Sequence, residues 1–122
     1  MKIRIKGNSI RIRLTKSEVD YFGSTGYLEE KTQFGNTELV YALRSKAGID
    51  EINAVYEGNT ITVNLPEALK KEWIDTNITG FENKMDIGGG RQLFLLIEKD
   101  FVCLDNTFED QSDNYPNPNA VC

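Results

Sequence analysis

Isoleucine alternates with charged residues over positions 2–6, and the alternation resumes after a Gly-Asn pair at 7–8. Strict alternation is typical of a strand with one buried face, and a Gly-Asn pair readily forms a two-residue hairpin turn. Two further Gly-Asn pairs, at 35–36 and 58–59, also stand between strand-like runs. The pattern therefore predicts three hairpins.

The turns also predict the register of these hairpins, because a two-residue turn fixes which residues face each other. The first and third hairpins then divide into an apolar and a polar face, as a half-buried antiparallel sheet requires, whereas the second is divided less cleanly. The predicted pairs are Lys2–Arg13, Ile3–Ile12, Arg4–Arg11 and Ile5–Ile10; Leu28–Leu43, Lys31–Val40 and Thr32–Leu39; and Ile52–Leu65, Ala54–Val63 and Tyr56–Ile61.

A fourth strand pair is predicted over residues 78–86 and 92–100, with its turn in the three glycines at 88–90. These glycines are followed by neither a phosphate-loop lysine nor a helix pattern, so they indicate a turn and not a nucleotide-binding loop. The run LFLLI at 93–97 is apolar at every position, which favours a central strand that is covered on both faces.

Two short helices are predicted. Thr15 and Glu18 have the spacing of a capping box, with Leu14 and Val19 as the hydrophobic staple, and we expect this helix to end at Gly23. The second helix begins around Pro66-Glu67 and carries Leu69 and Trp73 on one face. We interpret Trp73, and Phe22 in the first helix, as anchors that hold the helices on the sheet.

Residues 7–22 align without gaps on residues 58–73, an offset of 51 positions. The shared features are the turn, the Ile/Val face, the Leu before the helix and a closing aromatic, which together indicate a ββαββ-like unit used twice. The predicted fold is α+β and mainly antiparallel β, as a strongly curved sheet or barrel with two short helices. It forms one domain over residues 1–103, followed by an acidic, Pro/Asn-rich tail at 104–122.

The chain of 122 residues contains no histidine, which excludes Ser-His-Asp and Cys-His catalysis and imidazole-based zinc sites. No apolar run approaches the roughly 20 residues that cross a bilayer, and the amino terminus has no hydrophobic signal region. We therefore expect a cytoplasmic protein with no membrane partner and no cofactor. Cys103 and Cys122 are expected as free thiols, with a bridge between them as the open alternative.

Charge is distributed unevenly along the chain. Residues 1–16 contain six cations and no acid, whereas the net charge of the whole chain is −5. The predicted register brings Lys2, Arg4, Lys6, Arg11 and Arg13 to one face of the first hairpin. Like charges that face each other across two strands are destabilising, so this face needs compensation.

Three kinds of compensation are open. The long side chains can extend into water, where screening weakens their repulsion. Alternatively, acids of the same chain can pack against the face, either from the strand with Glu29, Glu30 and Glu38 or from the acidic tail at 104–122. The third possibility is an external anion.

The favoured function is a non-enzymatic binding module that engages a small anion or an acidic protein segment through these five cations. Nucleic acid is an unfavourable partner, since the isoelectric point near 4.8 means that the overall field repels a polyanion. Four acids in the tail could attract a hard cation, but their spacing fails the calcium-loop template and is better interpreted as a solvated tail. These acids are Asp105, Glu109, Asp110 and Asp113.

Two end motifs, KGNSIRIRLTKSEV and FVCLDNTFEDQSDNYPNP, resemble a family of small uncharacterised bacterial proteins that is known only as a domain of unknown function. The resemblance implies a bacterial cytoplasmic protein and supplies no catalytic residues.

The charged, alternating strands are also similar to those of the triphosphate tunnel enzymes, whose barrels bind triphosphate and metal. Their amino-terminal Glu-x-Glu-x-Lys metal motif is replaced here by KIRIK at 2–6, which reverses the charge where metal-binding carboxylates belong. A metal-dependent phosphate or triphosphate hydrolase therefore stays as an alternative, and a purely structural interaction protein is another.

Overall fold

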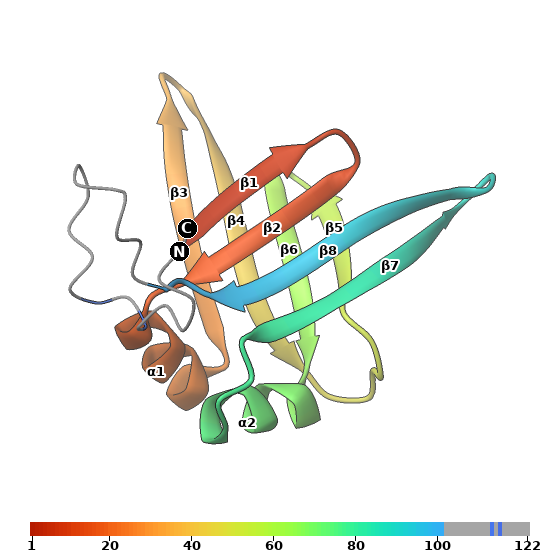
Figure 1. Ribbon diagram of the computed structural model, residues 1–122. Helices are drawn as coiled ribbons and strands as arrows, with labels where there is room; N and C mark the ends of the chain where they lie inside the picture. Colours follow the sequence, from red (N-terminus) through yellow and green to blue (C-terminus); the bar gives the residue numbers. More distant parts are fainter. Residues whose placement is uncertain (102–112, 114, 116–122) are drawn as a thin grey trace.

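The computed structural model describes residues 1–101, 113 and 115, and this part of the chain contains eight strands and two helices (Figure 1). In chain order the elements are β1 (Lys2–Lys6), β2 (Ser9–Leu14), α1 (Lys16–Thr25), β3 (Tyr27–Phe34), β4 (Thr37–Lys46), β5 (Asn53–Glu57), β6 (Thr60–Pro66), α2 (Glu67–Asp75), β7 (Gly80–Gly88) and β8 (Arg91–Lys99).

The strands form two four-stranded sheets. Sheet A has the order β1-β2-β8-β7, and sheet B has the order β3-β4-β6-β5. Each sheet joins two antiparallel hairpins through one parallel pair, β2 with β8 and β4 with β6. Figure 1 shows sheet A crossing in front of sheet B, with both helices at one end of the pair.

Neither sheet is closed or strongly curled, so the prediction of a strongly curved sheet or barrel is wrong. The α+β class and the mainly antiparallel pairing are confirmed. The parallel pairs explain the difference, because they join the first hairpin to the last and the second to the third. The strands are thereby divided between two open sheets, each with two edge strands.

The predicted hairpin registers are confirmed for every pair that lies within the strands, including Arg4 with Arg11 and Leu28 with Leu43. Ile52 lies just before β5, so its predicted pair with Leu65 of β6 falls outside the strand pairing, although both side chains are buried in the core.

The two halves of the chain follow one plan. The first half runs β1, β2, α1, β3 and β4, and the second half runs β5, β6, α2, β7 and β8 in the same order. If each strand of sheet A is replaced by its counterpart in the other half, the strand order of sheet B results. The register corresponds as well. The row across sheet A is Lys2, Arg13, Glu98 and Gly80, and the equivalent row across sheet B is Asn53, Asn64, Arg44 and Tyr27.

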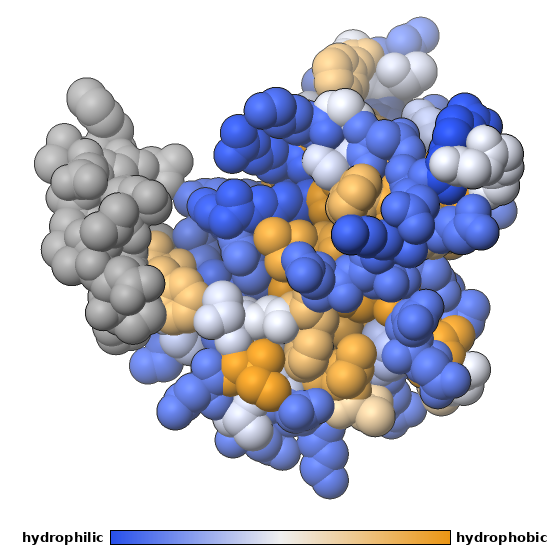
Figure 2. Space-filling view, turned by 45° about the vertical axis from the view of Figure 1, so that its right-hand side comes forward, coloured by the Kyte–Doolittle hydropathy of each residue, from blue (hydrophilic) through white to orange (hydrophobic). Residues whose placement is uncertain are grey.

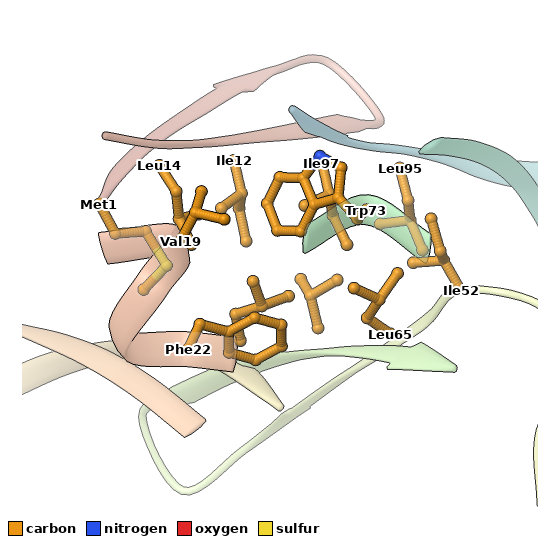
Figure 3. Packing of buried hydrophobic residues seen from close by; sticks show 12 residues of the cluster. Met1, Ile12, Leu14, Val19, Phe22, Ile52, Leu65, Trp73, Leu95 and Ile97 are labelled. Atoms are coloured by element: carbon orange, nitrogen blue, oxygen red, sulfur yellow. The ribbon is translucent and has the colours of Figure 1, made fainter. Parts of the chain in front are cut away.

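The hydrophobic core lies between the two sheets and under the helices (Figure 3). Phe22 of α1 and Trp73 of α2 are completely buried and pack edge to face, with ring centroids 6.4 Å apart. The indole N–H of Trp73 donates to the carbonyl of Thr79 at 2.9 Å, so its burial leaves no polar group unpaired. The interpretation of both aromatics as helix anchors is confirmed.

The capping box of α1 is confirmed, but the helix ends later than expected. Gly26, with φ +72°, is the left-handed residue at its end, three residues beyond Gly23. Gly23 has another role, since a Cβ atom there would come within 2.6 Å of the Ile74 side chain on α2. This glycine allows the two helices to approach each other closely.

Strand β8 is central, as predicted, but it is not covered on both faces. Leu95 and Ile97 point into the core, whereas Phe94 on the opposite face is 47% exposed. Both helices lie at one end of the sheets, and no described element covers the outer face of sheet A (Figure 1). Within the described part of the chain, neither helix is long and apolar enough to cross a membrane.

Candidate anion-binding groove

The five cations predicted to share one face do lie on the outer face of sheet A, because they alternate with the core isoleucines along β1 and β2. Their neighbours on β8 and β7 decide what each of them can do. Three rows cross the sheet: Lys2, Arg13, Glu98 and Gly80; Arg4, Arg11, Leu96 and Glu82; and Lys6, Ser9, Phe94 and Lys84.

Glu98 compensates the two arginines of β2. Its Oε1 atom accepts from Nε of Arg11 at 2.6 Å and from Nε of Arg13 at 2.8 Å. The Glu98 side chain is mostly buried and the guanidinium groups are about one-third exposed, so solvent weakens these pairs less than pairs at an open surface. The repulsion expected in the first hairpin is therefore offset by Glu98 of β8, the strand that pairs in parallel with β2.

Lys2 has an ion pair too: its Nζ lies 3.2 Å from Oδ2 of Asp100, just after β8. Compensation by acids of the same chain is thus confirmed for three of the five cations. The carboxylates come from Glu98 of β8 and from Asp100 just after it, which both precede the predicted tail at 104–122. The acids of the second hairpin do not serve this face. Glu30 instead contacts the amino group of Met1, and Glu29 pairs with Lys31.

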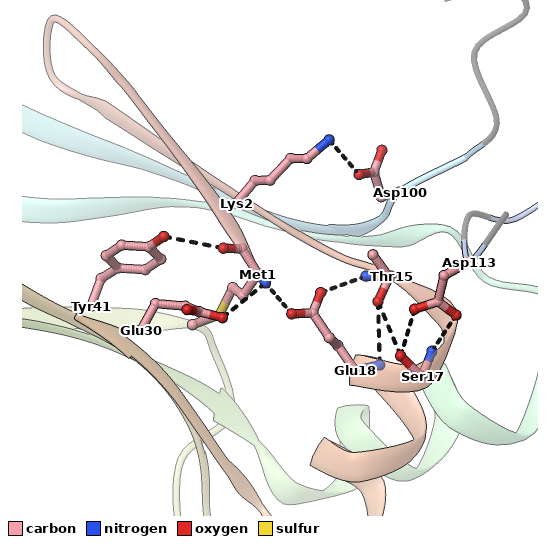
Figure 4. A network of polar contacts seen from close by, with 9 residues as sticks. All are labelled: Met1, Lys2, Thr15, Ser17, Glu18, Glu30, Tyr41, Asp100 and Asp113. Atoms are coloured by element: carbon pink, nitrogen blue, oxygen red, sulfur yellow. Dashed lines mark hydrogen bonds and ion pairs between the residues drawn. The ribbon is translucent and has the colours of Figure 1, made fainter. Parts of the chain in front are cut away.

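Glu18 and Asp113 belong to a separate polar network at the start of α1 (Figure 4). Glu18 accepts from the Met1 amino group and from the backbone N–H of Thr15 at 2.9 Å, and Asp113 accepts from the backbone N–H of Ser17 at 3.0 Å. Burial alone would raise the pKa of Glu18, but these hydrogen bonds outweigh it and lower that pKa. Hydrogen bonds from Ser17 likewise lower the pKa of Asp113. These acids stabilise a helix end and have no contact with the basic face.

The remaining cations, Arg4 and Lys6, border a groove of about 650 Å³ on the outer face of sheet A. Phe94 and Leu96 supply its apolar surface, and the groove is lined by Arg4, Lys6, Ser9, Ile10, Arg11, Glu82, Asn83, Lys84, Phe94, Leu95 and Leu96. Neither Arg4 nor Lys6 forms an ion pair with any residue that the structure describes.

Sequence reasoning missed the half of this groove that β7 and β8 contribute. Lys84 adds a fourth cation, and its Nζ lies 5.6 Å from the centroid of the Phe94 ring. Glu82 is the one carboxylate among the lining residues. The exposed side of LFLLI was the available signal, but it could not be placed beside the first hairpin without knowing that β2 pairs with β8.

A second cavity, of about 410 Å³, opens between the two sheets, and nearly all of its lining is apolar. It contains three pairs of equivalent residues from the two halves of the chain, namely Ile5 with Tyr56, Ile10 with Ile61, and Leu93 with Leu39. The space-filling view shows apolar patches among polar side chains on one side of the molecule (Figure 2). Charged residues do not line this cavity, so it is not a candidate anion site.

The predicted tail is described at two positions only. Besides the contacts of Asp113, the backbone N–H of Tyr115 donates to the carbonyl of Asp100 at 2.9 Å, and Lys99 Nζ lies 5.1 Å from the Tyr115 ring. Asp105, Glu109, Asp110, Cys103 and Cys122, together with the predicted boundary at 103–104, lie outside the described residues. Within the described ranges, no three acids or cysteines come together as metal ligands.

A protein-family model with the description "Family of unknown function (DUF7009)" matches residues 1–119, which agrees with the prediction of a family without assigned function. No curated protein and no solved structure matches the chain.

Proposed function

The chain belongs to the DUF7009 family, whose function is unknown, and we propose that it is a binding module that holds a small anion in the groove on the outer face of sheet A. The proposal divides the five predicted residues into two groups. Arg4 and Lys6 contact the anion directly, and Lys84 adds positive charge from β7 at the far side of the groove. Lys2 and Arg13 hold the acids Asp100 and Glu98, and Arg11 has a part in both groups.

One observation carries the proposal: two cations face the same groove and lack a described carboxylate partner, although acids neutralise the cations beside them. Four cations line the groove against one carboxylate, Glu82. Clustered charge in a concave site raises the local concentration of an oppositely charged ligand. An arginine adds donors in a fixed fork that matches the oxygen atoms of phosphate and carboxylate groups.

The size of the groove supports a small anion over an acidic protein segment. A volume of about 650 Å³ lies in the range of small-molecule sites. A stable protein partner covers roughly 800 Å² of each surface, which exceeds what this groove offers. The hydrolase alternative gains no support, since the described part of the groove offers Glu82 as its single carboxylate where a metal site needs several oxygen ligands.

The test is titration of the full chain with inorganic phosphate and pyrophosphate at low ionic strength, followed by calorimetry and by the shift in melting temperature. We expect saturable binding that weakens as salt is added. Replacing Arg4 and Lys6 together by alanine should lower the affinity by at least tenfold.

The matched control is Lys46→Ala with Lys71→Ala, which removes the same charge from exposed positions outside the groove. Its affinity for phosphate should stay within about twofold of the wild type, since distant exposed charges are screened. The proposal fails if the wild type binds neither anion, or if the two double variants lose affinity equally.

A further inference from the structure

The outer face of sheet A offers more than positive charge. Strand β1 contributes Arg4 and Lys6, strand β8 contributes Phe94 and Leu96, and the far edge strand β7 contributes Glu82 with Lys84. The groove thus runs from cations, across an apolar floor, to a hydrogen-bond acceptor. A ligand that matches all three must carry an anionic group at one end and a flat apolar body beyond it.

We propose that the ligand of this groove is a mononucleotide, with its base on Phe94 and its phosphate between Arg4 and Lys6; this rests on the proposed function. The aromatic part of the argument comes from the exposure of Phe94. A phenylalanine on a central strand loses about half of its hydrophobic stabilisation when nearly half of it faces water, so burial alone does not explain a ring at this position.

The other sheet shows that the fold does not need this ring. The position equivalent to Phe94 in sheet B is Val40, which is 9% exposed. The ring also attracts a cation already, as Lys84 Nζ lies 5.6 Å from its centroid. A base stacked on Phe94 takes the place of this flexible, exposed lysine.

Strand spacing sets the length of the ligand. Phe94 and Lys6 lie in one row with β2 between their strands, so their backbones are separated by two strand spacings, about 10 Å in total. Inorganic phosphate cannot span this distance, and neither can a ring that is joined directly to phosphate. A base that is linked through a sugar to its phosphate has the separation that the groove requires.

Glu82 completes the match on the other side of the floor. It lies on β7 in the same row as Arg4, Arg11 and Leu96, and a carboxylate in that position accepts hydrogen bonds from ring amino groups. The groove is therefore polarised, with the anion over β1 and the hydrogen-bond donor of the base over β7. A base with an exocyclic amino group, such as adenine, fits this order.

The experiment compares four probes on the full chain by calorimetry: adenosine 5′-monophosphate, ribose 5-phosphate, phenyl phosphate and inorganic phosphate. We expect the nucleotide to bind at least tenfold more tightly than ribose 5-phosphate, because stacking of the base on an aromatic side chain adds at least that much affinity. Phenyl phosphate should bind no better than ribose 5-phosphate, because its ring and anion are too close together.

Phe94→Ala should reduce the preference for the nucleotide to less than about threefold and leave the affinity for inorganic phosphate unchanged. Phe34→Ala is the matched control, since Phe34 is 60% exposed at the end of β3 and does not line the groove. Phe94→Leu keeps an apolar side chain without a ring and should behave like Phe94→Ala.

The outcomes separate the two proposals. If the wild type binds all phosphates equally, the mononucleotide is wrong although the anion site remains. If phenyl phosphate equals the nucleotide, or Phe94→Ala keeps the preference, the stacked and spaced arrangement is wrong. If no probe binds, the proposed function fails and the mononucleotide fails with it.

Discussion

The outer faces of sheets A and B share one strand order and one register, but they carry different side chains. The second row across the strands is Arg4, Arg11, Leu96 and Glu82 in sheet A, and Val55, Thr62, Ala42 and Glu29 in sheet B. Only the acid at the end of the row is the same. The next row keeps its lysine, Lys84 or Lys31, and differs at the other three strands.

This difference separates what the scaffold needs from what sheet A has added. The core positions of the two halves are all apolar, because both sheets must bury one face. The arginines and Phe94 have no such counterpart, and sheet B forms the same ladder of hydrogen bonds without them. The side chains that only sheet A carries are therefore not required by the scaffold, and we assign them to the basic face and its proposed ligand.

The largest effect is expected where the two sheets differ in backbone packing. A Cβ atom on Gly80 would lie 1.9 Å from the carbonyl oxygen of Ile97, whereas the equivalent position in sheet B holds the exposed Tyr27. Gly80→Ala should therefore lower the free energy of unfolding by about 3 kcal/mol, and Tyr27→Ala by under ~1 kcal/mol. Urea unfolding of both variants measures this, and equal losses would contradict the proposed difference in packing between the two positions.

A smaller difference is expected between the polar pairs of the first row. Asn64 is 1% exposed; its Oδ1 accepts from Arg44 Nε at 2.9 Å and its Nδ2 donates to Asn53 at 2.7 Å. Asn64→Ala leaves both partners unpaired and should cost about 2 kcal/mol of unfolding free energy. The equivalent Arg13→Ala should cost under ~1 kcal/mol, because Arg13 is partly exposed and Glu98 keeps Arg11. A larger loss for Arg13 would mean that its ion pair is the stronger support.

Glu98→Gln changes stability and binding in opposite directions. The variant removes the charge shared by Arg11 and Arg13, so the free energy of unfolding should fall by about 1–2 kcal/mol. The same change frees Arg11 for the groove, and phosphate affinity should rise several-fold. Calorimetry beside urea unfolding measures both quantities. A loss of affinity would show that Glu98 positions the arginines for the ligand and does not compete with it.

The sequence was most informative where structure is local. The Gly-Asn turns set the hairpin registers, and the Thr15–Glu18 spacing set the start of α1, because hairpins and caps are decided by residues close together in the chain. The predicted end of α1 was wrong because Gly23 is a glycine for another reason: the side chain of Ile74 on α2 leaves no room for a Cβ atom there. No local pattern near Gly23 contains that information.

The candidate site was predictable in part for the same reason. One hairpin brings its five cations to one face, and alternation alone reveals this. The partners Glu98, Phe94 and Lys84 lie more than 70 positions away in the chain, and they reach the hairpin through a parallel pairing that leaves no turn signal in the sequence. The curved sheet or barrel was wrong for this reason too, since no local pattern showed that the first hairpin pairs with the last in a separate sheet.

The two helix starts predict a difference in acid sensitivity. Glu18 caps α1 and its pKa is lowered in the folded protein, whereas α2 begins at Pro66 without a side-chain cap. The unfolded chain then binds the proton more tightly, so this contribution is present at neutral pH and is lost as pH falls below about 4.5. Glu18→Gln should cost about 1 kcal/mol at pH 7 and much less near pH 3. Glu67→Gln, in the first turn of α2, is the control, and a pH-independent cost for Glu18→Gln would contradict the assignment.

The smallest effect on stability is expected when the arginines of sheet A are copied onto sheet B. Val55→Arg with Thr62→Arg places two cations where Arg4 and Arg11 stand in sheet A, beside Glu29 as the equivalent of Glu82. Both positions are on the outer face, but Arg44 stands where Glu98 stands in sheet A, so the copied pair has no such acid beside it. Repulsion between these cations should lower the free energy of unfolding by under ~1 kcal/mol. The new face still lacks the aromatic floor, since Val40 stands in place of Phe94. Titration should therefore show added binding of inorganic phosphate but no added preference for the nucleotide. If the copied arginines unfold sheet B, then the arginines of the basic face depend on Glu98. Charge compensation, and not ligand binding, would then explain why sheet A carries the arginines together with Glu98.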